Sequence, residues 1–157
     1  MKIRHPRFVG LVAACAVSLA SIAVGAVAAE TPFKGTVDAV ETTTQVVFPT
    51  VFLDREGGGT ATYLGRYTEH VTMQIFIPTL SSTGAATFTA ANGDTMTATV
   101  AGQATRTSPT TLSIVEHYTI TGGTGRFADA TGSFDLASTL EQTTGASSGT
   151  FSGAIDH

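Results

Sequence analysis

Apolar and polar residues alternate along most of the chain after residue 30, and short turn-forming sequences separate the alternating segments. Such alternation is typical of β-strands that bury one face, because successive side chains on a strand point to opposite sides. The chain has 29 threonines, and a β-branched residue suits a half-exposed strand. The pattern predicts strands at approximately 33–41, 46–53, 59–67, 69–78, 85–91, 95–104, 111–121, 132–140 and 149–156.

Turn-forming residues recur at intervals too short for helices between the strands. The strongest hairpin signal is Asn92-Gly93, which lies between two alternating segments. Eight or nine short strands predict an all-β fold, an eight-stranded antiparallel barrel, with a two-sheet sandwich as the alternative. The other expected turns are Glu56 to Gly59, Ser81 to Gly84, Ser108-Pro109, Gly122 to Gly125 and Thr144-Gly145. Two further stretches, Thr43 to Pro49 and Thr105 to Thr110, are expected to be loops or edge segments.

The first 29 residues have the organisation of a signal peptide. A basic start is followed by an apolar run from Phe8 to Val27 and by small residues up to Ala29, as a signal peptidase requires. We therefore expect cleavage after Ala28 or Ala29. Residues 1–29 are then the signal peptide, residues 30–157 form a single β-barrel domain, and the protein is secreted or periplasmic.

Removal of this leader makes the chain more acidic. The leader contains three of the 8 basic residues and none of the 12 acidic ones, so five basic residues remain and the formal net charge becomes −7. An acidic surface disfavours nucleic acid and anionic membranes, so we expect no nucleic-acid partner and no membrane association after cleavage. Cys15, the only cysteine, also lies in the leader, so the mature domain has no disulfide.

The segment from Ile120 to Gly132 is the most informative stretch of the chain. It reads ITGGTGRFADATG and resembles the GGTG-[RK]-[FY]-A-x-A-x-G signature of the plant dirigent proteins and their allene oxide cyclase relatives. Upstream blocks such as Thr62 to Thr68 resemble exported bacterial proteins placed in the same barrel superfamily. The chain departs from the plant dirigent pattern at Asp129 and Thr131.

The resemblance implies an eight-stranded antiparallel, calycin-like barrel, in which the glycine motif joins two adjacent strands. It also implies a small hydrophobic ligand, cofactor-free isomerase or cyclase chemistry, and a trimer formed through the outer face of the barrel. We expect Arg126 and Phe127 to close one end of the barrel by packing and hydrogen bonding. The residues assigned to this structural turn are Gly122, Gly123, Gly125, Arg126, Phe127 and Gly132.

The same glycines fit a second pattern. Gly123-x-Gly125-x-x-Ala128 matches the loose dinucleotide-binding fingerprint, which presents a helix N-terminus to the pyrophosphate. Another alternating strand follows here in place of a helix. We therefore expect no nucleotide, and the resemblance implies no other cofactor.

Two of the predicted strands carry a glutamate on their apolar face. Glu69 is in phase with Val71, and Glu116 is in phase with Ile114 and Tyr118. A carboxylate in an apolar cavity has a raised pKa, which suits a general acid or base. Two tyrosines join the Glu69 face if the preceding strand continues without a bulge. The candidate pocket residues are Tyr63, Tyr67, Glu69, Glu116 and Tyr118.

A simpler arrangement is the alternative to this pocket. Both glutamates would then lie near strand ends in solvent, or would pair with Arg66 or Arg126. His70 and His117 each follow a glutamate directly, so each histidine points to the opposite face from its neighbour and neither Glu-His pair can hold one metal ion. We therefore expect no metal site.

Two functions remain open at this point. One is a barrel that binds a small hydrophobic compound, with or without cofactor-free isomerase or cyclase activity. The other is a non-catalytic exported barrel that serves stability or association. An open apolar lumen favours the first function, and a lumen packed solid favours the second. Apolar residues on both faces of 71–77 also predict a homo-oligomer, with a trimer preferred.

Overall fold

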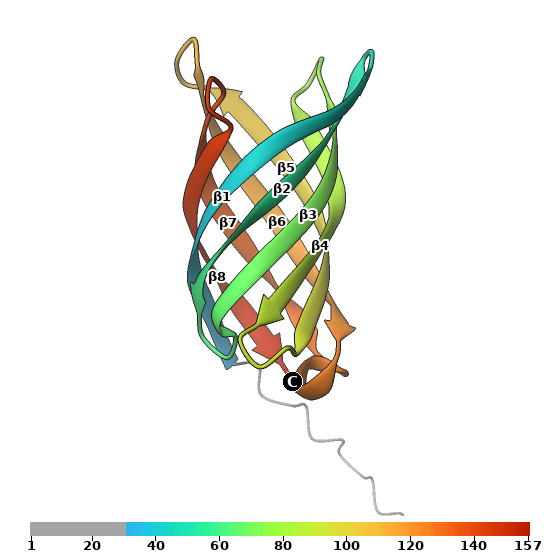
Figure 1. Ribbon diagram of the computed structural model, residues 1–157, viewed down its shortest axis with the longest axis vertical. Coiled ribbons are helices and arrows are strands. Elements are labelled where there is room, and N and C mark those ends of the chain that lie inside the picture. Colours follow the sequence, from blue (N-terminus) through green and yellow to red (C-terminus); the bar gives the residue numbers. More distant parts are fainter. Residues whose placement is uncertain (1–30) are drawn as a thin grey trace, which may run out of the picture.

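The computed structural model describes residues 31–157, which form one closed barrel of eight antiparallel strands (Figure 1). The all-β, eight-stranded antiparallel fold is therefore confirmed, and the two-sheet sandwich is excluded. The expected signal peptide, residues 1–29, lies outside the described residues. The strands are β1 (Thr31–Val47), β2 (Thr50–Ala61), β3 (Gly65–Phe76), β4 (Ser81–Ala90), β5 (Thr95–Arg106), β6 (Thr111–Gly123), β7 (Thr131–Glu141) and β8 (Ala146–Asp156).

Each strand pairs with its sequence neighbour, and β1 pairs with β8 to close the barrel. Residues 62–64, 91–94 and 124–130 connect strands at the same end as residues 31 and 157, and we call this the closed end (Figure 1). The hairpins at 48–49, 77–80, 107–110 and 142–145 lie at the opposite end, which we call the open end. Residues 31–157 contain no helix long and apolar enough to cross a membrane.

Side chains alternate between the barrel interior and its outer surface, as the sequence pattern predicts. Along β6, every second residue from Leu112 to Gly122 is buried, while Val115 and His117 are exposed. Along β3, Glu69 and Val71 are buried and His70 is exposed. The faces assigned to these two strands are therefore confirmed, because neither strand is interrupted by a turn within the region considered.

The glycine triplet at positions 57–59 was expected to form a turn, and this expectation is wrong. The triplet lies within β2, and the chain turns instead at residues 62–64. A Cβ atom on Gly59 would lie 1.9 Å from the carbonyl oxygen of Thr36 on β1. Glycine is needed here because neighbouring strands approach too closely for a side chain. The expected strands 46–53 and 59–67 are therefore joined through the triplet in β2, and residues 65–67 belong to β3. The nine expected strands become eight.

Two other boundaries also differ from the expectation. Residues 43–47 continue β1 in place of a loop, since their partners on β2 extend the hairpin toward the open end. The expected turn at Ser81 to Gly84 is part of β4, and residues 77–80 make the connection. By contrast, the turns at 91–94, 107–110 and 142–145 contain Asn92-Gly93, Ser108-Pro109 and Thr144-Gly145, as expected.

The half of the barrel next to the closed end is filled by aromatic side chains. Phe33, Phe88, Phe134 and Phe151 are almost fully buried, and Phe134 lies 4.9 to 5.9 Å, centroid to centroid, from the other three rings. Phe134 also stacks on Tyr118, with ring centroids 4.6 Å apart. Edge and tilted aromatic contacts of this kind add to the stability gained from burial. This half of the interior is a packed core.

The glycine motif joins β6 to β7 at the closed end, as the sequence predicts, but Gly122 and Gly123 are the last residues of β6 and Gly132 lies in β7. Phe127 belongs to a short 3-10 helix, Gly125–Phe127, and is fully buried in the core, so it helps to close this end. Arg126 remains exposed, and its Nε lies 3.8 Å from an Asp94 carboxylate oxygen. Gly132, the second residue of β7, has a φ of 129°, a backbone conformation that favours glycine.

Candidate functional site

A buried arginine lies in the middle of the barrel. Arg55 comes from β2, next to the glycine triplet, and only 2% of its surface is exposed. Inward-facing residues alternate along β2, so Arg55 follows Leu53 on the interior face. Its pairing partner on β1 is Glu41, and its pairing partner on β3 is Val71. Arg55 therefore occupies the level between the aromatic core and the open end.

The guanidinium of Arg55 binds groups from two other strands. Its Nε donates a hydrogen bond to Glu69 Oε1 at 3.0 Å, and its Nη1 donates one to Glu116 Oε2 at 2.9 Å. Its Nη2 donates to the hydroxyl of Tyr118, which in turn donates to Glu116 Oε2 at 2.8 Å. A further carboxylate oxygen, Glu41 Oε1, lies 4.0 Å from Nη1. These five residues form the charged cluster of the interior.

The charged cluster contains more acid than base. Three carboxylates surround one guanidinium, which leaves two negative charges in excess when all the groups are ionised. Burial by itself lowers the pKa of Arg55, but the surrounding Tyr118, Glu116 and Glu69 raise it by more, so the guanidinium stays charged. Burial raises the pKa of Glu69 even though Arg55 acts in the opposite direction.

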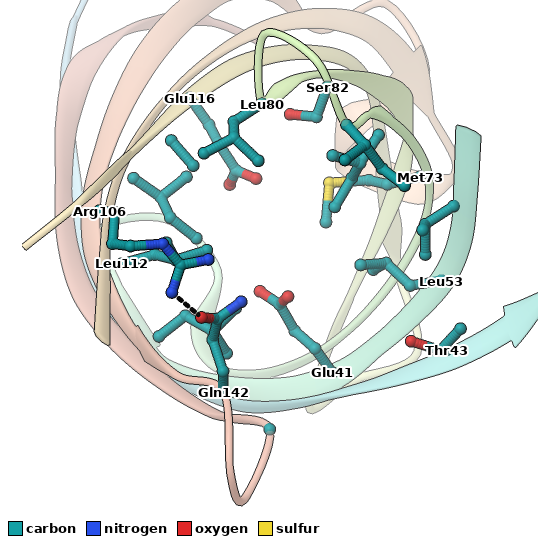
Figure 2. Close-up of a pocket in the computed structure, with 17 residues that line it drawn as sticks. Glu41, Thr43, Leu53, Met73, Leu80, Ser82, Arg106, Leu112, Glu116 and Gln142 are labelled. Atoms are coloured by element: carbon teal, nitrogen blue, oxygen red, sulfur yellow. Dashed lines mark hydrogen bonds between the residues drawn. The ribbon is translucent and has the colours of Figure 1, made fainter. Parts of the chain in front are cut away.

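Glu41 can reduce this excess of negative charge by taking up a proton. Burial raises its pKa from 4.5 to about 7, with Arg55 lowering it and the carboxylates of Glu116 and Glu69 raising it further. The Glu41 side chain is 6% exposed, and its buried Oε1 accepts no hydrogen bond from any group within residues 31–157. Figure 2 shows that Glu41 and Glu116 both point into a cavity above the cluster.

This cavity occupies the half of the barrel next to the open end. Its volume is about 350 Å³, and the carboxylates of Glu41 and Glu116 lie at its inner end. At its mouth, the Arg106 guanidinium donates to the Gln142 side chain at 2.9 Å (Figure 2). It also donates to the Pro109 carbonyl at 2.8 Å. The apolar residues of its wall are Val51, Leu53, Met73, Ile75, Ile77, Leu80, Ala104, Leu112, Ile114 and Leu140.

The structure brings four of the five candidate pocket residues into the interior. Glu116 lines the cavity, and Glu69 and Tyr118 belong to the charged cluster beneath it. Tyr67 is also buried, but its hydroxyl donates to the Thr36 carbonyl at 2.9 Å and its ring packs in the aromatic core. Of these four residues, only Glu116 is part of the cavity wall, and the other three lie beneath the cavity.

Tyr63 is not a pocket residue, and the expectation that it shares the Glu69 face is wrong. It lies in the turn between β2 and β3 with a φ of 66°, and its side chain is partly exposed. Its ring contacts that of His157 at the closed end, with centroids 4.7 Å apart. The strand does not continue through this region, so the alternation that placed Tyr63 inside does not apply.

Sequence reasoning missed Glu41 and Arg55, although both left a signal. Glu41 is in phase with the apolar residues Val37 and Ala39 on the same strand, and Arg55 is in phase with Leu53. The sequence offers Arg66 and Arg126 as cations that could pair with Glu69 and Glu116, but Arg55 forms both of these ion pairs. The expected turn at the glycine triplet concealed Arg55, because it ended the strand before that residue.

The outer surface carries the two histidines that follow the glutamates. His70 Nδ1 lies 2.5 Å from an oxygen of Glu56, and His117 Nδ1 lies 2.7 Å from an oxygen of Asp135. Both pairs are exposed on the barrel wall. Within residues 31–157, no group of three or more acidic, histidine or cysteine side chains has the geometry to hold a metal ion.

Comparisons with protein-family models, with curated proteins and with solved structures find no match for this chain.

Proposed function

We propose that this protein binds a small hydrophobic compound in the open half of its barrel. The observation that supports this proposal is the cavity of about 350 Å³, whose wall is formed mainly by aliphatic side chains. Ligand sites in proteins have volumes from this range upward, with apolar walls and a few polar groups that orient the ligand. Here Glu41 and Glu116 are those polar groups at the inner end, and Arg106 is one at the mouth.

The alternative is a barrel that serves only stability or association. A cavity lined by aliphatic side chains costs free energy, because its lining atoms lose packing contacts. The aromatic residues around Phe134 show that this chain fills the other half of the same barrel. An unfilled half is therefore better explained by a ligand than by a purely structural role.

Cofactor-free isomerase or cyclase activity is the second candidate function. Glu41 favours it, because a buried carboxyl with a pKa of about 7 exchanges protons readily near neutral pH. In such a step, the Glu41 carboxylate takes a proton from the carbon next to a carbonyl group, and an enolate forms. The acidic inner end of the cavity disfavours that anion, so binding without turnover is the preferred proposal.

Deuterium exchange separates the two functions. The probe is 2-octanone in deuterium oxide, with the hydrogens next to the carbonyl followed by proton NMR. Catalysed exchange that is lost in Glu41→Gln supports proton-transfer chemistry. Exchange at the rate of buffer alone, with the ketone bound, supports the binding function.

A pair of matched substitutions tests the binding function itself. Ala104 lines the cavity, whereas Ala101 is exposed on the outer face of the same strand. The larger side chain of Ala104→Phe would occupy part of the cavity, so this variant should bind the neutral fluorescent probe N-phenyl-1-naphthylamine about tenfold or more weakly. Ala101→Phe should leave binding unchanged. Equal binding by both variants, or no binding by the unsubstituted protein, contradicts the proposal.

We also propose a relationship to the allene oxide cyclase and dirigent barrels, on the basis of the glycine motif and the eight-stranded fold. Export through residues 1–29 remains part of this proposal. Mass spectrometry of the exported protein tests cleavage of this segment, and an intact Met1 contradicts it.

Assembly into a homo-oligomer, with a trimer preferred, is a separate proposal. The outer face of β3 is mainly polar, so the apolar surface that supports assembly lies elsewhere. Exposed apolar side chains occur at Val46, Val47 and Phe48 on the β1–β2 hairpin and at Val115 on β6. Light scattering at micromolar concentration tests the proposal, and a monomeric mass contradicts it.

A further inference from the structure

We propose that the inner end of the cavity binds the ammonium group of a small hydrophobic amine, and that the carboxylate of Glu41 receives it. The aliphatic wall would then hold the hydrocarbon part of the same molecule. This inference rests on the proposed ligand-binding function and names the chemical class of the ligand.

The first observation is the state of the Glu41 side chain. It is buried and points into the cavity, yet its Oε1 accepts no hydrogen bond from residues 31–157 (Figure 2). A buried carboxylate oxygen is costly when it is left without a donor. Its nearest cationic atom, Arg55 Nη1, is 4.0 Å away and already donates to Glu116. The Glu41 carboxylate, which lines the cavity, therefore has one oxygen that lacks a donor.

The second observation is the charge around this acceptor. Arg55 is the only basic side chain in the charged cluster, and its nitrogens already donate to Glu69, Glu116 and Tyr118. The cluster holds two negative charges in excess when its carboxyl groups are ionised. A ligand that supplies both positive charge and hydrogen-bond donors satisfies the site on both counts.

An ammonium group meets this requirement better than the other common polar groups. It has three donors and a positive charge, and hydrogen bonds to an ionised acceptor are roughly twice as strong as neutral ones. A hydroxyl group supplies one donor but leaves the excess charge in place. A ligand carboxylate is repelled by Glu41 and Glu116 at the inner end. The basic residue that lines the cavity is Arg106, which lies at the mouth. The site should therefore rank amine above alcohol, and alcohol above carboxylate.

Proton release provides a signature of this mode of binding. The charged and titratable groups around Glu41 are Arg55 on β2, Glu69 on β3 and Glu116 and Tyr118 on β6, and Arg106 on β5 lines the same cavity. An ammonium group and a proton compete for the Glu41 carboxylate. Because the pKa of Glu41 is about 7, amine binding near neutral pH should release about half a proton per molecule bound. Affinity should fall as the pH is lowered further.

The experiment compares octylamine, 1-octanol and octanoate by isothermal titration calorimetry. At about pH 8, where the Glu41 carboxyl is mostly ionised, octylamine should bind about tenfold more tightly than 1-octanol, and octanoate should bind most weakly. Titrations of octylamine near neutral pH in buffers of different ionisation enthalpy measure the protons released by the unsubstituted protein. This second measurement does not depend on whether any variant folds.

Two glutamine substitutions provide the control. Glu41→Gln should abolish both the preference for octylamine and the proton release. Glu141 lies near the open end but outside this cavity, so Glu141→Gln should change neither. Stronger binding of 1-octanol or octanoate, or amine binding without proton release, overturns the inference while leaving the binding function in place. Failure of all three compounds to bind overturns both.

Discussion

Replacement of Glu41 by glutamine should make the protein more stable at alkaline pH. The amide has nearly the same shape as the protonated carboxyl group, but it never ionises. In the unsubstituted protein, raising the pH forces a buried side chain to take a negative charge beside Glu69 and Glu116. Glu41→Gln removes that cost while keeping the packing around the inner end of the cavity.

The magnitude follows from the pKa of Glu41 in the two states. The pKa of Glu41 is 4.5 in the unfolded chain, its ordinary value, and about 7 in the folded protein. Between these two pH values, the folded state keeps a proton on Glu41 that the unfolded state has lost. A group with a raised folded-state pKa contributes stability below its unfolded pKa and loses it as the pH rises through its folded pKa. For this difference in pKa, the loss is about 3 kcal/mol.

Urea denaturation followed by circular dichroism measures this effect. The free energy of unfolding should be determined for both proteins at about pH 4.5, 6 and 8, and the difference between them compared across pH. Glu69 also has a raised pKa, but it is present in both proteins and largely cancels in the difference. The advantage of Glu41→Gln should grow by about 3 kcal/mol from the lowest pH to the highest. Asp129→Asn, which changes an exposed carboxylate, is the control.

A difference that stays constant with pH would refute the reasoning. It would mean that the Glu41 carboxyl ionises equally easily in the folded and unfolded chains, and is therefore not desolvated. A variant that is less stable at about pH 8 would refute it more strongly, because it would show that the ionised group is favourably bound in the folded protein.

Two further predictions concern the barrel wall and the charged cluster. Arg55→Met should lower the free energy of unfolding by about 3–5 kcal/mol at about pH 8, because it leaves buried carboxylates unpaired. The loss should be smaller at lower pH, where those carboxylates take up protons. Arg106→Met, at the exposed mouth, is the control and should lower the free energy of unfolding by no more than about 0.5 kcal/mol in the same urea assay. Equal costs for the two arginines would contradict the cluster. Gly59→Ala should lower the thermal unfolding temperature more than Gly102→Ala does. A Cβ atom at position 59 would lie 1.9 Å from the Thr36 carbonyl oxygen, whereas one at position 102 would first meet the movable Ser82 side chain at 2.6 Å. The reverse order would contradict the close approach of the strands at β2.

The residues that share a face of β3 or of β6 were predictable because alternation needs only an uninterrupted strand. Glu69 and Glu116 could therefore be placed on the apolar faces of their strands, and the structure shows that both side chains are buried. Their partner was not predictable by the same reasoning, since the contact between Arg55 and Glu116 spans 61 positions and depends on how the barrel closes. Periodicity identifies the face of a residue but not the residue opposite.

The glycine triplet shows a second limit of the sequence. Glycine occurs in tight turns because it tolerates positive φ, and it occurs in strands where two backbones approach closely. Composition alone does not distinguish these two causes at positions 57–59. Tyr63 was misplaced for the same reason, because the location of the turn decides which residues continue the alternation.

Closure of the barrel pairs its first strand with its last, and the Thr31 hydroxyl donates to the Ile155 carbonyl across 124 positions of sequence. A contact between residues this distant in sequence costs more chain entropy than a hairpin contact, so we expect this pairing late in the folding reaction. The hairpins form from local sequence, whereas the interior that buries the carboxylates of Glu41, Glu69 and Glu116 is complete only when the ring closes. During synthesis the chain therefore keeps two unpaired strand edges until β8 has been released, and in that interval edge-to-edge aggregation competes with folding.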